Sequence, residues 1–301
     1  MIISKHYQLG KVQKELDFAD IKITDDTRLF IDPWLIKDSK SHFAQRSADY
    51  VSTFFQELLK SIGDGDDERA MELLSHLHEI NWTRLGYSLK GMRGKAIAEE
   101  HADQILHALK ASKAVKTKVL KDLEDTALLI PGIHKDKISD MITNIIMPLL
   151  IEFSNEQAKI HGMPLVPVKV PTYFWDPATR KWFRAQPFML PEYNGKPVLL
   201  VPKQLLNKEL AVNSHVFYNK YILEYEQENH FRNPSLGLCR LLKDGTQIPP
   251  SKKDLKPVYP NNNNLIVKYV NEHHELLERY KQDLSGKRTV QKRRKSDPLE
   301  G

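Results

Sequence analysis

The segment GIHKDKISDMITNIIMPLLIEFSNEQAKIHG, residues 132–162, carries the longest helical pattern in the chain. One apolar stripe at helical spacing consists of Ile138, Ile142, Ile145, Leu149 and Phe153. Asp136, Asp140 and Asn144 are spaced four residues apart, so we expect them together on the opposite face. Pro148 predicts a kink or a break, and Glu152 falls near the apolar stripe, where an acid needs a partner. The pattern predicts a core helix with a second, polar face that the core does not explain.

Composition limits the class of protein. The 301 residues are 41% hydrophobic and 28% charged, which suits one large domain or two modest ones. No run approaches the ~18 consecutive apolar residues of a transmembrane helix, so we expect no membrane association. The start, MIISKHYQLGKVQ, lacks the apolar core of a signal peptide and indicates a cytoplasmic protein. The single cysteine, Cys239, excludes an intramolecular disulfide and multi-cysteine metal sites, and we expect it to pack as a small apolar side chain.

Much of the positive charge lies at the C-terminus. The last sixteen residues hold six Lys or Arg against two acids, which accounts for +4 of the net charge of +6. No apolar periodicity accompanies these charges, so residues 285–301 are expected to form a basic, disordered tail. Such a tail could contact phosphates or an acidic partner, or it could be a solvated end without a function.

An acidic residue ends an apolar segment near the N-terminus. IKITDDTRLFIDPWLI, residues 21–36, reads as a strand, a turn at Asp25-Asp26 and a second strand that Pro33 stops. Asp32 ends the second strand, a position where metal-dependent enzymes hold acids. The alternative is that Asp32 caps a helix beginning at Pro33.

Several further elements are predicted from periodicity and turn signals. Helices are expected at His42 to Ile62, Glu68 to Leu77 (capped by Asp66 or Asp67), Val115 to Ile130, much of Leu205 to Glu228, and Leu265 to Leu284. A hairpin should pair Tyr173 to Trp175 with Trp182 to Phe183, and a later strand should span Pro197 to Val201. Lys203 follows that strand, as lysines of nuclease cores do. However, Val201 stands where the acid of a D/E-x-K motif belongs.

A glycine segment precedes a helix in LGYSLKGMRGKAIAEEHADQILHALK, residues 85–110. Its candidate phosphate-binding residues are Gly86, Ser88, Lys90, Arg93, Gly94 and Lys95. Glycines permit close backbone approach, and a helix start offers free N–H groups, so the segment has the chemistry of an anion cradle. The order of residues is not that of a Walker loop. A flexible loop with a solvated basic face is the alternative.

Four segments together resemble a known group of sequences. LFIDPWLI, LGYSLKGMRGKAIA, GIHKDKISDMITNII and PVLLVPKQLL are similar, in order and spacing, to segments of an uncharacterised bacterial protein family. The resemblance extends from Asp25 to Leu206. It implies a context in phage-defence and mobile-element gene neighbourhoods, without an established activity. The positions that it favours are Asp32, Gly86, Ser88, Gly94, Asp136, Asp140, Asn144 and Lys203.

This chain departs from the family pattern in two places. His134 stands where the group usually has glycine, and Met141-Ile142-Thr143 replaces the usual Met-Thr-Thr. Neither departure removes a proposed ligand, although His134 could alter the approach to Asp136.

The expected fold is α+β, mostly helical, with a small antiparallel or mixed sheet built from strands within 21–32 and 165–201. We expect an α+β core domain over residues 1–206, a helical C-terminal subdomain over 207–284 and the basic tail after it.

The first functional hypothesis is an Mg- or Mn-dependent phosphodiester hydrolase that acts on nucleic acid. Its hard oxygen ligands would be Asp32 and Asp140, with Asn144 or Asp136 completing the shell. Lys203 would stabilise developing negative charge, and the glycine segment would hold a phosphate.

Two other hypotheses use the same residues. In one, the chain is a non-catalytic subunit of a defence complex that binds nucleic acid or partner proteins encoded in the same operon. In the other, it is a toxin that consumes a nucleotide or NAD. The sequence does not determine the substrate, the trigger or the oligomeric state.

Overall fold

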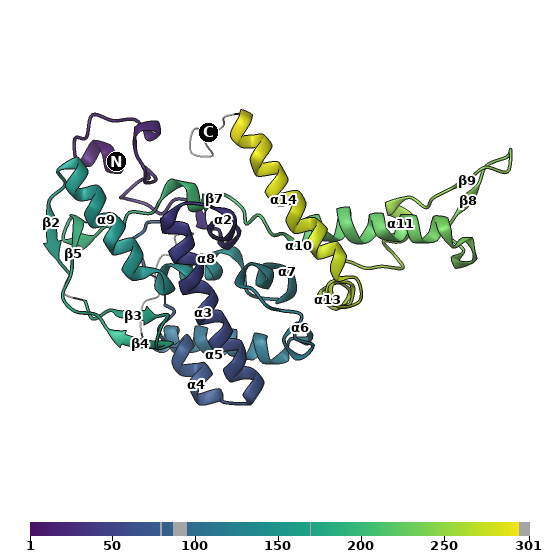
Figure 1. The fold of residues 1–301 in the computed structure, drawn as a ribbon, viewed down its shortest axis with the longest axis horizontal. Coiled ribbons are helices and arrows are strands. Elements are labelled where there is room, and N and C mark those ends of the chain that lie inside the picture. The colour runs from purple at the N-terminus through teal and green to yellow at the C-terminus, as the bar shows by residue number, and fades with distance from the viewer. Residues whose placement is uncertain (79, 87–94, 169, 295–301) are drawn as a thin grey trace.

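The computed structural model describes residues 1–78, 80–86, 95–168 and 170–294, with the backbone alone at 95–99, 101 and 287–294. Helices dominate, and the paired strands form small antiparallel sheets, which confirms the expected α+β, mostly helical fold (Figure 1).

The helices of the first two thirds are α1 (Ile3–His6), α2 (Pro33–Asp38), α3 (His42–Asp64), α4 (Asp67–Leu74), α5 (Lys95–Ala111), α6 (Lys113–Lys116), α7 (Thr126–Leu129), α8 (Lys135–Ile145) and α9 (Met147–His161). Those that follow are α10 (Ser214–Phe217), the π-helical η4 (Tyr218–Ile222), α11 (Leu223–Arg232), α12 (Lys252–Leu255), α13 (Asn263–Glu272) and α14 (His274–Arg294). Short 3-10 turns are η1 (Gln13–Glu15), η2 (Leu123–Asp125), η3 (Lys203–Leu205) and η5 (Pro234–Leu236). The strands are β1 (Phe30–Ile31), β2 (Leu165–Pro167), β3 (Tyr173–Asp176), β4 (Lys181–Arg184), β5 (Met189–Tyr193), β6 (Lys196–Pro197), β7 (Leu206–Asn207), β8 (Arg240–Leu241) and β9 (Gln247–Ile248).

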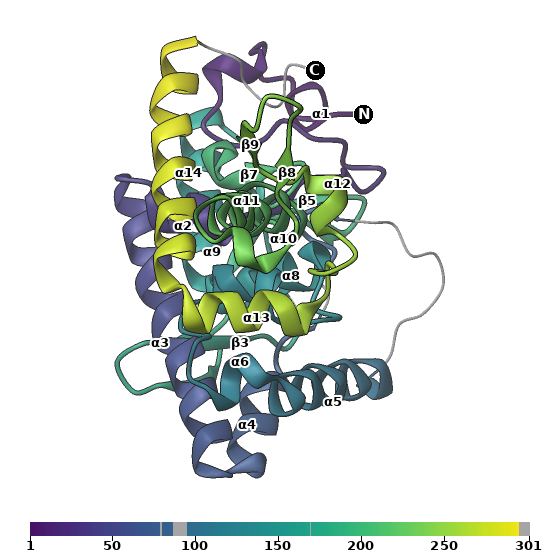
Figure 2. The same cartoon turned by 90° about the vertical axis from the view of Figure 1, so that its right-hand side faces the viewer.

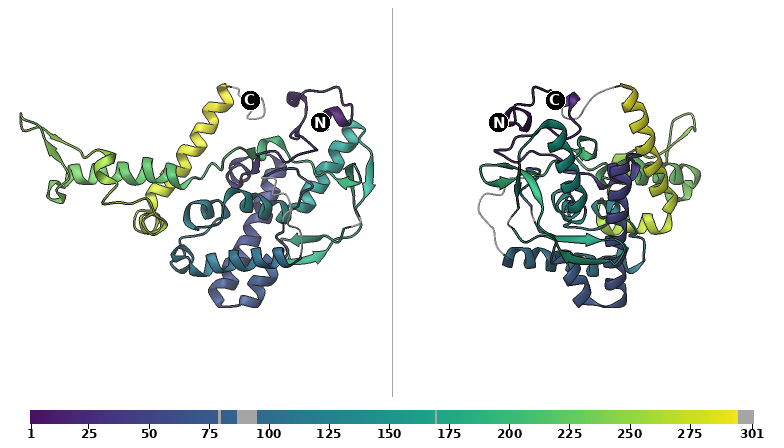
Figure 3. Two further views of the ribbon diagram at one scale, coloured as in Figure 1. Left: turned by 180° about the vertical axis from the view of Figure 1, so that it is seen from behind. Right: turned by 60° about the vertical axis from the view of Figure 1, so that its left-hand side comes forward.

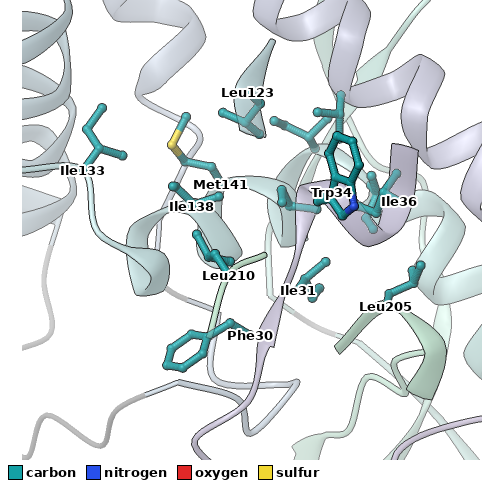
Figure 4. Close-up of a cluster of buried hydrophobic side chains, with 14 of the residues drawn as sticks. Phe30, Ile31, Trp34, Ile36, Leu123, Ile133, Ile138, Met141, Leu205 and Leu210 are labelled. Carbon is teal, nitrogen blue, oxygen red and sulfur yellow. The ribbon is translucent and has the colours of Figure 1, made fainter. Parts of the chain in front are cut away.

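Helices α8 and α9 form the centre of the core. Ile138, Ile142 and Ile145 are fully buried, and the buried side chains of β1, α2 and α8 form one apolar cluster (Figure 4). The Ile31 amide donates to Ser139 Oγ at 3.0 Å, which fixes β1 on α8. The segment around residues 132–162 therefore organises the packing, as its pattern predicted.

The expected break occurs at Pro148. Helix α8 ends at Ile145, and α9 starts at Met147 with Pro148 in its first turn, where the missing N–H costs nothing. The break changes the phase of the second helix. As a result, Glu152 is exposed and pairs with Arg46 at 2.8 Å, whereas a continuous helix would have turned it toward the apolar stripe.

The hairpin expected between two tryptophans is present. Strands β3 and β4 pair antiparallel, with Trp175 directly opposite Trp182 and their ring centroids 5.6 Å apart. The Trp175 indole donates to Thr53 Oγ1 at 3.2 Å, and its ring lies edge-on to Phe54 of α3. The hairpin therefore closes one side of α3.

The strand expected at Pro197 to Val201 is wrong beyond Pro197, although Val198 to Val201 are buried. The amides of residues 198, 199 and 200 bond to Pro191 O, Trp82 O and Ser154 Oγ in turn. Because each amide finds a different neighbour, no strand ladder can form.

The single sheet expected from residues 21–32 and 165–201 is also wrong. β1 pairs only with β7, while β2, β5 and β6 form a separate sheet. Distant pairing of this kind leaves no local signal, because a two-residue strand is too short for a recognisable alternation.

Two predicted helices are divided. Residues 115–130 contain α6, η2 and α7, with Lys118 at a φ of +58° between α6 and η2. The helix expected at Leu265 to Leu284 breaks at His273 into α13 and α14, which meet at a corner (Figure 2). α14 continues to Arg294, so residues 285–294, expected to begin the unstructured tail, are helical.

Residues 223–258 form an arm that projects from the body (Figures 1 and 3). It consists of α11, the two-stranded β8–β9 hairpin and α12. At its base, Tyr269 of α13 donates to the buried Glu226 of α11 at 2.6 Å. Farther out, Leu241 is 74% exposed.

No helix within the described ranges is long and apolar enough to cross a membrane.

The hairpin provides a test of the core. Trp175→Ala removes a fully buried ring and should lower the free energy of unfolding by about 3–5 kcal/mol. The matched control is Phe183→Ala on the same hairpin, since that ring is about half exposed and its loss should cost under about 1 kcal/mol. Urea denaturation of both variants measures the difference. Equal losses would contradict the packing of Trp175 against α3.

Candidate functional site

Asp32 serves as a buried helix cap. Its Oδ1 accepts from the Trp34 amide at 3.0 Å, which caps α2, and its Oδ2 accepts from the Ala211 amide at 2.8 Å. The side chain of Asn207 approaches the same Oδ2 at 3.4 Å. The residue is only 1% exposed. Both oxygens are thus occupied by protein donors, and this geometry matches the capping alternative.

The surroundings of Asp32 shift its pKa upward. Burial raises the pKa of this carboxyl to about 6, against the lowering effect of the Ala211, Trp34 and Asn207 donors. The charge of Glu124 raises the pKa further.

Asn144 is also engaged in structural contacts. Its Nδ2 donates to His78 O at 2.7 Å and to Asp140 O at 2.8 Å. The residue is 3% exposed, so the expected polar face of α8 is covered at Asn144, whereas Asp136 and Asp140 are half-buried. This amide fastens α8 to the segment after α4.

Lys203 lies at the contact between η3 and the N-terminal segment. Its Nζ donates to Gln13 O at 3.0 Å and to Lys14 O at 3.2 Å, so it ties the N-terminal segment to η3. Neither of these two hydrogen bonds joins Lys203 to Asp32 or Asp140, the residues beside which it was predicted to act. Within the described part of the chain, no group of three or more His, Cys, Asp or Glu side chains could hold a metal.

Gly86 and Asp136 bring two of the family segments together. Gly86 has a φ of +100°, and a Cβ built on it would lie 2.5 Å from Asp136 Oδ1. Only glycine permits this approach without displacing the carboxylate. Asp140 lies one helical turn farther along α8, so the carboxylates of Asp136 and Asp140 lie on the same face of this helix.

A cavity of about 540 Å³ opens beside the N-terminus of α8. Its lining includes Asp136, Lys135, Lys137 and Glu209. Lys135 Nζ pairs with Glu209 and lies 4.7 Å from the centre of the Phe30 ring, and Lys137 donates to Gln104 at 3.3 Å. Because acids and bases alternate here, the cavity has no strong preference for an anion.

The structure describes only part of the glycine segment. Ser88, Lys90, Arg93 and Gly94 lie outside the described residues, and Lys95 is described only as the first backbone position of α5. The anion-cradle hypothesis therefore remains a prediction for these positions.

A lysine segment begins in the last turn of α5, and the sequence analysis did not predict a role for it. Residues 110–121, KASKAVKTKVLK, hold five lysines and no acid. All five are exposed, and only Lys110 has a salt-bridge partner, Asp67, within the described structure. The unpaired members are Lys113, Lys116, Lys118 and Lys121. A count of charge in short windows would have found this cluster, whereas the search for apolar periodicity passed over it.

The pH dependence of stability tests the state of Asp32. Because its folded pKa is raised to about 6 from 3.8, the folded state binds the proton more tightly. The contribution of Asp32 to stability is therefore present at low pH and lost as pH rises through about 4 to 6. The free energy of unfolding of Asp32→Asn minus that of wild type should therefore increase by about 2–3 kcal/mol as the pH rises from 4 to 7.

Urea unfolding across that pH range measures the difference. Loss of the Ala211 contact in the variant adds an offset that does not vary with pH, so only the slope is diagnostic. A difference that stays constant with pH would refute the raised pKa.

Comparison with family models finds one match, over residues 8–213, to the family described as "Domain of unknown function (DUF8370)". No curated protein and no solved structure matches the chain. The matched region contains Asp32, Gly86, Asp136 and the lysine segment, and it ends before the arm and α14. Because the match covers more than half of the sequence, this chain belongs to the DUF8370 family.

Proposed function

We propose that this chain is a nucleic-acid-binding subunit of a bacterial antiphage-defence system. The lysine segment is the observation that carries the proposal, and the resemblance to proteins from phage-defence neighbourhoods supplies the context. In this role the chain contacts phosphates and assembles with proteins encoded in the same operon.

The electrostatics of the lysine segment support phosphate binding. Lys113, Lys116, Lys118 and Lys121 hold four positive charges on exposed side chains. The acids that follow them in the sequence, Asp122, Glu124 and Asp125, pair with Lys37 and Lys281 instead. Lysines that are not ion-paired release condensed counterions when they meet a phosphate backbone, and this release drives sequence-independent binding. Paired lysines contribute less, because the ion pair must first be broken.

Occupied side chains favour the binding subunit over the hydrolase. Both oxygens of Asp32, the Nδ2 of Asn144 and the Nζ of Lys203 form hydrogen bonds within the protein. A nuclease site built from these residues would have to break such contacts before it could bind a metal.

Binding at graded salt tests the proposal. Lys113→Ala together with Lys116→Ala should weaken binding of DNA or RNA and reduce the slope of log K against log[salt] by about 1.4–1.8. Both positions lie in α6, where alanine is compatible with the helix. Lys118 is left unchanged because its φ of +58° would add strain to the comparison.

The matched control is Lys159→Ala with Lys196→Ala, two exposed lysines on other elements. Fluorescence anisotropy with labelled duplex and single strands measures both pairs. The same salt slope in all proteins would show that the lysine segment does not contact nucleic acid. A separate truncation after Ser285 reports on the basic residues of the C-terminus.

The second candidate function is the Mg- or Mn-dependent phosphodiester hydrolase. The observation that favours it is the approach of Gly86 to Asp136, with Asp140 one turn away on α8. Carboxylate oxygens are the ligands that these ions prefer, so Asp136 and Asp140 are the candidate ligands of this function. A bound ion would polarise a phosphodiester there, and the two carboxylates would position it.

Asp140→Asn separates the two functions. In the hydrolase, added Mn²⁺ should raise the melting temperature of wild type and leave the variant unchanged, because the ion stabilises only the state that binds it. Metal-dependent cleavage of plasmid, single-stranded DNA and RNA should fall by orders of magnitude. The control is Asp49→Asn on the exposed side of α3.

Both assays use the chain alone and with any operon partner, and chelator serves as the blank. Cleavage that survives chelator, or an equal Mn²⁺ response in wild type and Asp140→Asn, excludes the metal site. If nucleic-acid binding depends on salt and Mn²⁺ does not change the melting temperature, the result supports the binding subunit and not the hydrolase.

A further inference from the structure

An open cavity of about 440 Å³ lies beside the lysine segment, between α6 and α13. One wall includes Lys113 and Thr117 of the lysine segment, and the other comes from α13 and the residue just before it. The first wall lies inside the region that matches the DUF8370 family model, whereas the second lies beyond it. The cavity therefore extends the lysine segment onto the last third of the chain.

Each wall of this cavity carries an exposed lysine. Lys113 has no salt-bridge partner in the described structure. The side chain of Lys268 is 61% exposed, and its carboxylate neighbour, Glu272, lies 3.9 Å away. An exposed pair at that distance contributes little, so the ammonium of Lys268 can exchange this partner for another anion. Two positive charges therefore flank the cavity, one on each side.

Asparagine side chains add neutral hydrogen-bond donors to the same cavity. Asn264 and Asn271 line it from α13, both are exposed, and neither forms a side-chain hydrogen bond within the described ranges. Asn262 also lines it and uses its Oδ1 to cap α13 at the Leu265 amide, so its side-chain N–H groups remain as donors. In protein–DNA complexes, amides of this kind donate to phosphate and sugar oxygens.

This surface lacks the aromatic rings on which single-stranded nucleic acids stack. Residues 110–121 contain no Phe, Tyr, Trp or His, and the described residues that line the cavity include none either. The one aromatic ring of α13, Tyr269, is buried and donates its hydroxyl to Glu226. Sequence-tolerant binding of single strands depends on stacking of bases on such rings. The contacts that this surface offers are therefore to the sugar–phosphate backbone.

A duplex provides a more favourable backbone for such contacts than a single strand does. Its two strands together present one phosphate charge per about 1.7 Å of helix axis. Base pairing also fixes the path of its backbone, whereas an unstacked single strand loses conformational freedom when it follows the same path. Lysines and amides on two walls therefore favour the paired form.

We propose that the lysine segment and the cavity between α6 and α13 form one surface that binds the backbone of double-stranded nucleic acid. This inference rests on the proposed function and specifies its substrate class. Lys113 contacts phosphates from one wall, Lys268 contacts them from the other, and the asparagine amides donate to oxygens of the same backbone. Glu272 opposes binding, because its carboxylate lies in the cavity and repels phosphates.

Fluorescence anisotropy with the full-length protein compares a DNA duplex, an RNA duplex of the same sequence and the separate strands of each, all at one salt concentration. At least one duplex should bind about tenfold or more tightly than its own single strands. The two duplexes distinguish B-form from A-form geometry.

Two substitutions in α13 should change duplex affinity in opposite directions. Lys268→Ala removes a phosphate contact, so it should weaken duplex binding about threefold or more and lower the slope of log K against log[salt] by about 0.9. Glu272→Gln removes the repelling charge at nearly constant size, so it should strengthen duplex binding about twofold or more. Both side chains are exposed, so neither melting temperature should move by more than about 2 °C.

Lys253→Ala is the matched control. Lys253 of α12 is exposed and has no salt-bridge partner in the part of the chain that is described, but it does not line this cavity. Its replacement removes the same charge and should leave the affinity for every probe unchanged.

Three results would overturn this inference while the proposed function stands. Single strands bind as tightly as duplexes, or Lys268→Ala binds duplex as wild type does, or Glu272→Gln fails to strengthen duplex binding, while the Lys113→Ala, Lys116→Ala pair still lowers the salt slope. If wild type binds neither duplexes nor single strands, the proposed function fails, and this inference fails with it.

Discussion

The structure depends on one buried carboxyl. Asp32 begins α2, and through Oδ2 it receives the amide of Ala211, near the end of the region that defines the family. The carbonyl of Ala211 in turn accepts from the Tyr280 hydroxyl of α14 at 2.9 Å. A chain of hydrogen bonds therefore runs from the first strand to the last helix. Replacement of such a carboxyl by an apolar side chain would leave these amide donors unpaired in the core, which gives the acid a structural role in an apolar segment.

The sequence predicts best those elements that depend on residues close to one another along the chain. Helix α3, the Asp66 cap of α4, the break at Pro148 and the tryptophan hairpin depend on residues close in sequence, and all were predictable. The path of residues 198–201 was not, because each amide there bonds to a different distant neighbour. The candidate site likewise has local features that the sequence predicts and long-range contacts that it does not. The acids were recognisable, but the partners that occupy Asp32, Asn144 and Lys203 come from segments up to 190 residues away.

The polar surfaces of the molecule divide by charge. Exposed lysines gather after α5, whereas acids and bases alternate at the N-terminus of α8. A long polyanion suits the first of these surfaces, since it is open and of one sign.

The last third of the chain leaves the body at residue 213 and returns to it through α14. Lys281 approaches Asp122, Glu124 and Asp125 within 2.7–3.6 Å, and Ser285 donates to Asp38 at 2.8 Å. The segment that follows the arm is therefore fixed to the body through α14. A protease that cuts the exposed turn between β8 and β9 would give two fragments that migrate together on a sizing column. High salt would weaken the lysine contacts, so the cleaved chain should separate more readily there.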